Sequence, residues 1–148
     1  MKIKEYTTYY KNRLRKAIDT LSKESRINLS TTGVETDSIL FSLTTFSTHW
    51  SNFILLDNSN KIIAFSRIKD SGKLFEIQGF FVPQDLQRKG YGSHLMCFLI
   101  GYTKGKKGKG LTLEVRKGNS KGIAFYKTFG FKRTRLKDLE VYGMVLRF

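Results

Sequence analysis

The sequence predicts a mixed α/β domain, and three features of its 148 residues point to this class. Hydrophobic residues make up 40% of the chain and aromatic residues 14%, which suits a packed core and not a disordered chain. Apolar residues change between helical and strand spacing along the chain, so helices and strands are interspersed. No linker rich in proline, glycine or serine interrupts this pattern, and we therefore expect one domain over residues 1–148.

The first third of the chain is predicted to be mainly helical. Residues 2–6 are expected as a short first strand. Apolar residues at positions 10, 14, 17, 18 and 21 have helical spacing and predict a helix over residues 8–23. A second, shorter helix is predicted over residues 36–46, with these side chains facing inward: Ile39, Leu40, Leu43 and Phe46.

Three strands are predicted in the middle of the chain. The first two cover residues 53–57 and 61–68, and Asp57-Asn58-Ser59-Asn60 between them has the composition of a hairpin turn. A second turn, Asp70-Ser71-Gly72, leads to a third strand over residues 73–82.

The second half is predicted to contain two helices and three more strands. A helix over residues 90–103 has positions 92, 95, 96 and 99 on one face. The second helix is capped by Asn119 or Ser120, runs to about Phe129 and ends at Gly130. The strands have these ranges: 111–116, 131–135 and 141–147.

The net charge of +15 is large for this length and unevenly spread. Residues 75–148 carry 15 Lys and Arg against 5 Asp and Glu. A basic surface attracts polyanions such as nucleic acid, a phosphorylated cofactor or an acidic protein, although a solvated surface without a partner explains the same charge. The stretch from Lys104 to Gly110 places four lysines among glycines and is predicted to be a flexible basic loop.

Cysteine and histidine are rare in this chain. The single cysteine, Cys97, lies among apolar residues and is expected to be buried and inert. One cysteine forms no intrachain disulfide, which is compatible with a reducing cytoplasm, where we expect the protein. Together with His49 and His94 it makes no usual structural zinc site, so no metal is expected.

No signal peptide is expected, and without an apolar run of about 18 residues no membrane span is expected either.

The segment from Phe80 to Ser93 contains the pattern that most specifically indicates a function. A strand leads into a short loop, and the loop begins a helix. The first N–H groups of a helix have no partner within it, and the helix dipole favours an anion there. Gly90 and Gly92 allow a ligand to approach the backbone closely, so this segment predicts a phosphate-binding loop.

Two common phosphate-binding patterns do not fit. A Walker loop needs Gly-Lys followed by Ser or Thr, which the glycines of residues 105–110 lack, and a dinucleotide fingerprint needs Gly or Ala where Leu95 stands. The segment Gln87-Arg88-Lys89-Gly90-Tyr91-Gly92 instead resembles the pyrophosphate motif of GNAT acyltransferases, Gln/Arg-x-x-Gly-x-Gly/Ala. Residues 119–131, with Asn119, Tyr126, Gly130 and Phe131, resemble the second signature of that superfamily. The similarity covers roughly residues 53–148.

The resemblance implies a twisted mixed sheet with helices on both faces, whose fourth and fifth strands splay apart around acetyl-CoA. By this resemblance, Phe80, Phe81 and Val82 pair with the pantetheine arm, and the N–H near Phe80 polarises the thioester carbonyl. Asn119 bonds the pantetheine or caps the last helix. The pyrophosphate is held by these residues: Gln87, Arg88, Lys89, Gly90, Tyr91, Gly92 and Ser93. Simple surface exposure is the other reading of Arg88 and Lys89.

The resemblance also implies catalytic residues. Tyr126 matches the family tyrosine that faces the sulfur and protonates the departing thiolate, although a core tyrosine is the alternative. Glu76, on the strand just before an expected bulge, matches the general base of the histone-lysine acetyltransferase branch. Glu114 matches that of the ribosomal-protein N-terminal acetyltransferases, although a structural ion pair also explains it. We favour Glu76 over Glu114, and a reaction without a dedicated base remains the third alternative.

The amine acceptor is less defined by the sequence. Both local resemblances favour a lysine or N-terminal amine of a protein or peptide, by direct transfer in a ternary complex. Polyamines and other small amines are disfavoured because the basic chain repels cations and no acidic site is evident. An aminoacyl-tRNA acceptor would suit the charge, with steeply salt-dependent binding. A non-catalytic module that binds CoA or nucleic acid is a further alternative, and both monomer and homodimer are compatible with the sequence.

Overall fold

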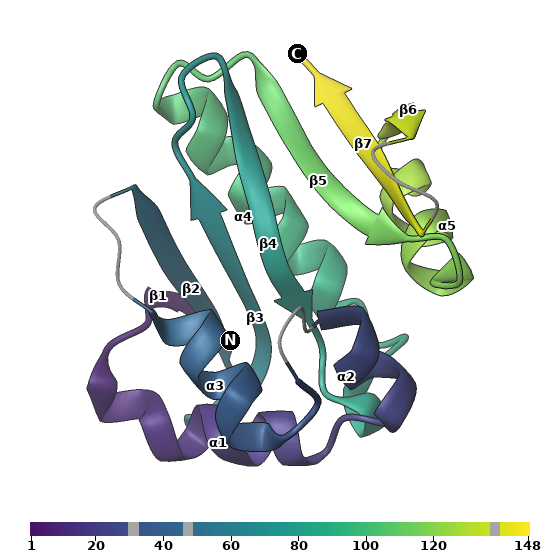
Figure 1. Cartoon of the computed structure of the whole chain (residues 1–148). Helices are drawn as coiled ribbons and strands as arrows, with labels where there is room; N and C mark the ends of the chain where they lie inside the picture. The colour runs from purple at the N-terminus through teal and green to yellow at the C-terminus, as the bar shows by residue number, and fades with distance from the viewer. Residues whose placement is uncertain (30–32, 46–48, 137–139) are drawn as a thin grey trace.

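The computed structural model describes residues 1–29, 33–45, 49–136 and 140–148, with the backbone alone at 135 and 136. Within these residues the chain forms a seven-stranded sheet in the order β1-β2-β3-β4-β5-β7-β6 (Figure 1). Neighbouring strands are antiparallel except for β4 and β5, which are parallel. The strands are β1 (Lys2–Glu5), β2 (Trp50–Leu56), β3 (Ile62–Lys69), β4 (Leu74–Phe81), β5 (Gly110–Arg116), β6 (Lys132–Leu136) and β7 (Val141–Arg147).

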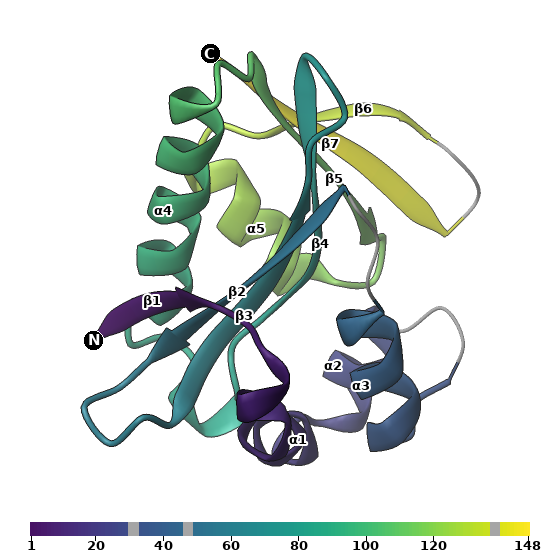
Figure 2. The ribbon, with the colours of Figure 1, turned by 90° about the vertical axis from the view of Figure 1, so that its left-hand side faces the viewer.

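Helices cover both faces of the sheet, as the sequence predicts. The helices are α1 (Lys11–Asp19), α2 (Lys23–Leu29), α3 (Thr36–Thr44), α4 (Tyr91–Gly105) and α5 (Ser120–Thr128), with 3-10 turns η1 (Thr8–Tyr10) and η2 (Gln84–Leu86). Figure 2 shows α4 and α5 on one face and α1, α2 and α3 on the other. None of the helices in the described part of the chain is long and apolar enough to cross a membrane.

Strand β2 shows how one strand contributes to the core on both faces. Phe53 and Leu55 pack toward α4 and α5, whereas Ile54 and Leu56 pack toward α1 and α3, and all four are buried. Successive side chains of a strand point to opposite faces, so a continuous apolar run fills both layers at once. The central strands are therefore a rigid scaffold for the ends of β4 and β5.

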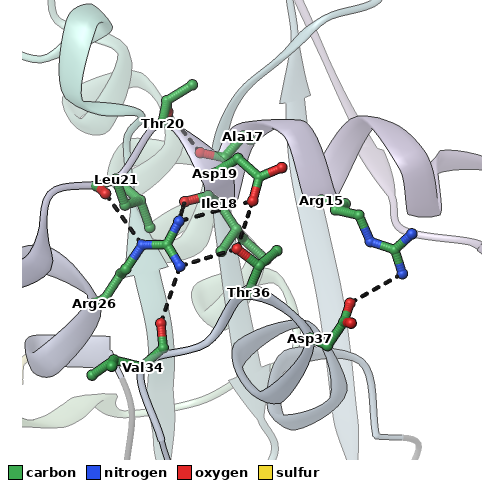
Figure 3. A network of polar contacts seen from close by, with 10 residues as sticks. All are labelled: Arg15, Ala17, Ile18, Asp19, Thr20, Leu21, Arg26, Val34, Thr36 and Asp37. Atoms are coloured by element: carbon green, nitrogen blue, oxygen red, sulfur yellow. Dashed lines mark hydrogen bonds and ion pairs between the residues drawn. The ribbon is translucent and has the colours of Figure 1, made fainter.

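The predicted helix over residues 8–23 is wrong in its extent, and α2 was not predicted. Helix α1 ends at Asp19, and Ser22 begins a new helix because its hydroxyl accepts the backbone N–H of Ser25 at 3.1 Å. The guanidinium of Arg26 donates to the carbonyls of Ile18 (3.1 Å) and Leu21 (3.2 Å) at the break (Figure 3). Hydrogen bonds to a charged group thus compensate for the helix turns that are lost.

The prediction for the second helix is partly confirmed. Helix α3 ends at Thr44, and Ile39, Leu40 and Leu43 are buried as expected. The predicted inward position of Phe46 lies outside the described residues.

The expected burial of Cys97 is wrong. Cys97 is exposed on α4, whose neighbouring residues Leu95, Met96 and Leu99 face the sheet and are fully buried. Position 97 lies about 100° around the helix from position 96, which turns it away from the sheet. An apolar neighbourhood in sequence therefore does not bury a residue on the outer face of an amphipathic helix.

Candidate active site

The site is built where β4 and β5 separate. Their parallel pairing is limited to three residue pairs: Leu74 with Gly110, Phe75 with Leu111, and Glu76 with Thr112. β4 continues to Phe81 and β5 to Arg116, but the described residues show no further pair between them. The strands diverge beyond Glu76 (Figure 1), which leaves backbone donors and acceptors along this edge of β4 without a strand partner there.

A β-bulge in β4 shapes its free edge. The pairing with β3 shifts by one residue between the Phe65–Phe81 pair and the Arg67–Gln78 pair. Gly79 lies in this shift with φ of +64°, and a Cβ atom there would be 2.4 Å from Cδ2 of Leu43. Only glycine therefore allows α3 to pack this closely on the bulge, which follows Glu76 as the sequence analysis expected.

A cavity of about 710 Å³ occupies the gap between the two strands. On one face of the sheet it is lined by α2 and by Leu43 of α3, and on the other by the first turn of α4 and by α5. Its size is typical of ligand pockets, which range from about 300 to 1,000 Å³. Because it has walls on both faces of the sheet, two reactants can meet in it from opposite sides.

The first turn of α4 follows the loop that the sequence analysis expects to bind phosphate. Gly90 has φ of +86° and precedes the helix, and no side chain caps this end. The first intrahelical bond in this turn runs from the His94 N–H to the Gly90 carbonyl at 3.0 Å, so the N–H groups at positions 91–93 are not used within the helix. Arg88 has the left-handed φ of +63° and lines the cavity. This arrangement can bind an anion through backbone donors and the helix dipole.

The side chain of Gln87 closes the loop. Its Nε2 donates to the Val82 carbonyl at 3.1 Å, so it fixes the turn that joins β4 to α4. Gly92 lets α4 approach α5 on the same face of the sheet, since a Cβ there would lie 3.4 Å from Cζ of Phe125. Lys89 is exposed and is not among the residues lining the cavity, and its expected contact with the pyrophosphate stays a prediction.

Asn119 caps α5, which was one of its two expected roles. Its Oδ1 accepts the backbone N–H of Gly122 at 3.0 Å. Asn119 also lines the cavity, and its side-chain amide retains N–H donors for a ligand.

Tyr126 lies on α5 within a cluster of aromatic rings. Its ring centroid is 6.3 Å from that of Phe80, 5.5 Å from that of Phe125 and 5.8 Å from that of Phe131. Burial raises the pKa of the Tyr126 phenol from 10.0 to about 12, because the phenolate is poorly solvated there. Tyr126 lines the cavity and stays protonated over the whole neutral range, so it can act as a hydrogen-bond donor.

The two candidate bases line the same cavity. Glu76 is half-buried in the last residue pair before β4 and β5 separate, and Glu114 is exposed on β5 opposite Gly143 of β7. Their neighbours Ile77 and Leu113 are buried against α4 and α5, so both carboxylates belong to the face covered by α2 and α3. In the part of the chain that the structure describes, no three His, Cys, Asp or Glu side chains gather as a metal site.

Phe80 and Phe81 at the end of β4 contribute to the cavity in different ways. Phe81 lines the cavity, and its side chain is buried in the core layer of α1 and α3, where it stacks on Phe65 at 5.7 Å. The ring of Phe80 packs on that of Phe125 at 5.6 Å. The predicted residues that line the cavity are Glu76, Phe80, Phe81, Val82, Gln87, Arg88, Gly90, Tyr91, Gly92, Ser93, Glu114, Asn119 and Tyr126.

Helix α2 supplies site residues that the sequence analysis missed. Glu24, Ser25 and Asn28 line the cavity from α2. The helix is tethered across the gap, because Nε of Arg116 donates to the Ile27 carbonyl at 3.1 Å and the Ser25 hydroxyl lies 3.5 Å from Oε1 of Gln84. The serine pair at positions 22 and 25 was the one available signal for this helix start.

The chain belongs to the acetyltransferase (GNAT) family, whose sequence model matches residues 16–131. This match spans the fork between β4 and β5, the loop before α4 and the tyrosine of α5. No curated protein sequence is similar enough to the chain to count as a match.

Several solved structures share the fold at low sequence identity. The GNAT domain of PAT from S. lividans is 16% identical, with a TM-score of 0.84 over 99% of this chain and 89% of that one. The ribosomal-protein-S18-alanine N-acetyltransferase of Escherichia coli is 20% identical, with a TM-score of 0.76 over 99% and 92%. Spermidine N-acetyltransferase from Vibrio cholerae, in complex with CoA and spermine, is 13% identical with a TM-score of 0.78 over 99% and 94%.

Proposed function

We propose that this protein transfers an acetyl group from acetyl-CoA to a primary amine of a protein or peptide, directly within a ternary complex. The observation that carries this proposal is the cavity at the fork of β4 and β5, which has walls on both faces of the sheet. It brings an anion-binding helix start, an unpaired strand edge, a protonated tyrosine and two carboxylates to one place.

The residues around the fork fit acetyl-CoA. The free N–H groups at the start of α4 suit a pyrophosphate, and Arg88 adds positive charge beside them. The unpaired edge of β4 from Ile77 to Phe81 can bond the amides of a pantetheine arm as a further strand would. Bound acetyl-CoA supplies the activated acetyl thioester, and we assign its cradle to the segment Gln87–Ser93.

The protein groups have separate tasks in the transfer. Glu76 takes a proton from the ammonium of the acceptor, directly or through water, and the free amine forms a bond to the thioester carbonyl carbon. The backbone N–H near Phe80 stabilises the charge that develops on the carbonyl oxygen. The carbon–sulfur bond breaks, the nitrogen releases its second proton to solvent to become the amide, and the sulfur takes a proton from the Tyr126 hydroxyl, which regains one from solvent. No covalent enzyme intermediate is needed.

We assign the acceptor to the part of the cavity on the sheet face that α2 and α3 cover. A protein or peptide is favoured because a net charge of +15 repels small free polycations, and the fold-related E. coli enzyme acts on a ribosomal-protein alanine. A small polyamine is the second candidate, because Glu24 joins Glu76 and Glu114 on the cavity wall. These three carboxylates give the cavity wall an acidic character that the sequence analysis did not detect.

Paired substitutions of the two glutamates test the assignment of the base. We expect Glu76→Gln to lower kcat/KM about 100-fold or more, the usual loss for a general base, and Glu114→Gln to lower it far less. Acetyl-CoA affinity should be similar in both variants, because neither carboxylate belongs to the pyrophosphate cradle. Acetyl transfer to a panel of peptides and to spermidine is the measurement.

Three other outcomes are informative. A larger loss in Glu114→Gln moves the base to Glu114, and small losses in both variants argue for a reaction without a dedicated base. If the wild-type protein binds acetyl-CoA but acetylates none of the acceptors, the catalytic proposal fails and a binding module remains.

A further inference from the structure

Six exposed cationic side chains gather at the end of the sheet opposite the fork, a region called the basic end below. They are Lys73 after β3, Lys104, Lys106, Lys107 and Lys109 at the end of α4, and Arg147 at the end of β7. The Lys109 N–H donates to the Lys73 carbonyl at 2.6 Å, and Gly110 pairs with Arg147. The three segments therefore meet at the amino ends of β4 and β5, near the C-terminus in Figure 1.

The basic end is separate from the proposed acetyl-CoA cradle. The cradle precedes α4 and the basic end follows it, and the 15 residues of this helix span about 22 Å. None of the six cations lines the cavity at the fork. Their charge therefore does not serve the phosphates of acetyl-CoA.

Acidic residues do little to balance this charge. The segments 71–75, 101–113 and 141–148 contain no Asp or Glu. Asp70, in the turn after β3, accepts the backbone N–H of Gly72 at 3.1 Å. The basic end consequently keeps a strong positive potential, which attracts a polyanion.

The loop that presents the lysines is held rigidly, contrary to the flexible loop that the sequence predicted. The Lys107 N–H donates to the Lys104 carbonyl and the Gly108 N–H to the Thr103 carbonyl, both at 2.9 Å, which is the Schellman pattern of a helix end. The Phe148 N–H donates to the Lys109 carbonyl at 2.9 Å. These hydrogen bonds define the backbone positions from which the lysines extend.

Lys107 occupies the position where such a helix end normally has glycine. Its φ is +63°, in the left-handed region that side chains with a Cβ atom rarely adopt. Favourable contact with the helix dipole explains a lysine in the last turn, but not one in this conformation, nor Lys73 and Arg147 on other segments. Residues other than glycine in this conformation are frequent at functional sites, so the conformation of Lys107 supports a function for its side chain.

We propose that the basic end binds the phosphate backbone of a nucleic acid, without reading its sequence. A membrane surface is less suitable, because Phe148 is the one large exposed apolar residue that the described part of the chain brings to this end. Phosphate contacts by lysine need no base recognition and give strongly salt-dependent binding.

The test measures binding of a fluorescein-labelled RNA duplex by fluorescence anisotropy over a range of KCl concentrations. The variant carries Lys106→Gln, Lys107→Gln and Lys109→Gln, and the matched control carries Lys2→Gln, Lys4→Gln and Lys11→Gln, which are also exposed. Each phosphate contact adds about −0.9 to the slope of log K against log salt, so the variant should reduce the slope by up to about 3 and weaken binding roughly tenfold or more. The control should change affinity less than about twofold, since loss of distant charge is screened.

Lys107→Gly distinguishes a binding role of the Lys107 side chain from a purely structural role. It should bind RNA more weakly and yet melt at a higher temperature, because glycine relieves the left-handed conformation. The proposal is overturned by RNA binding that ignores salt, by an equal loss in the control variant, or by Lys107→Gly binding as tightly as the wild type. Binding to anionic phosphatidylglycerol vesicles in the absence of RNA binding would overturn it in favour of a membrane.

Discussion

At the scale of single residues, local environment decides whether a side chain can act in the reaction. The Tyr126 hydroxyl would be an ordinary phenol in water, but burial raises its pKa to about 12. A phenol with this pKa is protonated at every pH where an enzyme assay is practical. The protonated form, which the proposed transfer to the sulfur uses, is therefore the form present in the assay.

Tyr126→Phe should lower kcat about 100-fold while leaving acetyl-CoA affinity nearly unchanged. The phenyl ring keeps the contacts with Phe80, Phe125 and Phe131, so only the proton donor is removed. Steady-state kinetics and calorimetry on the same variant separate the two effects. Unchanged turnover would remove Tyr126 from the mechanism.

The same variant tests the raised pKa through the pH dependence of stability. In the unfolded chain the phenol loses its proton as pH rises through about 10, whereas in the folded chain it keeps it to about 12. The unfolded state therefore binds fewer protons between pH 10 and 12, and the contribution of Tyr126 to stability, complete below pH 10, is lost over this range. Urea unfolding should show the wild type losing more stability than Tyr126→Phe over that interval, and parallel curves would contradict the shift.

At the scale of secondary-structure elements, Arg26 determines how α1, α2 and α3 are arranged. Besides the carbonyls of α1, its Nη1 donates to the Val34 carbonyl and the Thr36 hydroxyl, both at 3.0 Å (Figure 3). One guanidinium thus joins the end of α1, the body of α2 and the start of α3. Since α2 lines the part of the cavity that we assign to the acceptor, Arg26 indirectly positions the residues proposed to contact the acceptor.

Arg26→Ala should lower the free energy of unfolding by about 2–3 kcal/mol, because several charge-assisted hydrogen bonds are lost together. It should also raise KM for the acceptor more than KM for acetyl-CoA. Arg15→Ala is the matched control, since Arg15 bonds the largely exposed Asp37 at 3.2 Å and such pairs contribute at most about 1 kcal/mol. Urea unfolding of both variants checks this, and equal losses would contradict the account.

Elements with a regular pattern could be predicted from sequence, and those fixed by single polar side chains could not. The alternation in residues 111–116 and the loop Gln87–Gly92 predicted β5 and the start of α4. Nothing periodic marks the break before α2, which depends on the Ser22 cap and on Arg26 contacts with residues up to ten positions away. The conformation of Lys107 was equally hidden, because position 107 lacks the glycine that usually marks such a helix end, and only the hydrogen bonds of that end show it.

At the scale of the whole molecule, the two ends of the sheet are proposed to have different partners. The diverging ends of β4 and β5 form the cavity, and their paired ends carry the basic end. The sequence predicted the splayed strands through family resemblance and the charge excess through composition. It did not predict that the six cations of the basic end lie away from the cavity, because only the fold brings Lys73, Lys104 and Arg147 to one end of the sheet.

The account depends most on the claim that the cavity binds acetyl-CoA, and isothermal titration calorimetry tests it directly. The wild type should bind acetyl-CoA and CoA in the micromolar range and give no heat with ATP. Gly92→Ala is the control variant, and it should keep both its melting temperature and its affinity, since the new Cβ meets only Phe125 and Val82, no closer than 3.4 Å, and the motif allows alanine at this position. Absence of binding to both acetyl-CoA and CoA by the wild type would contradict the account.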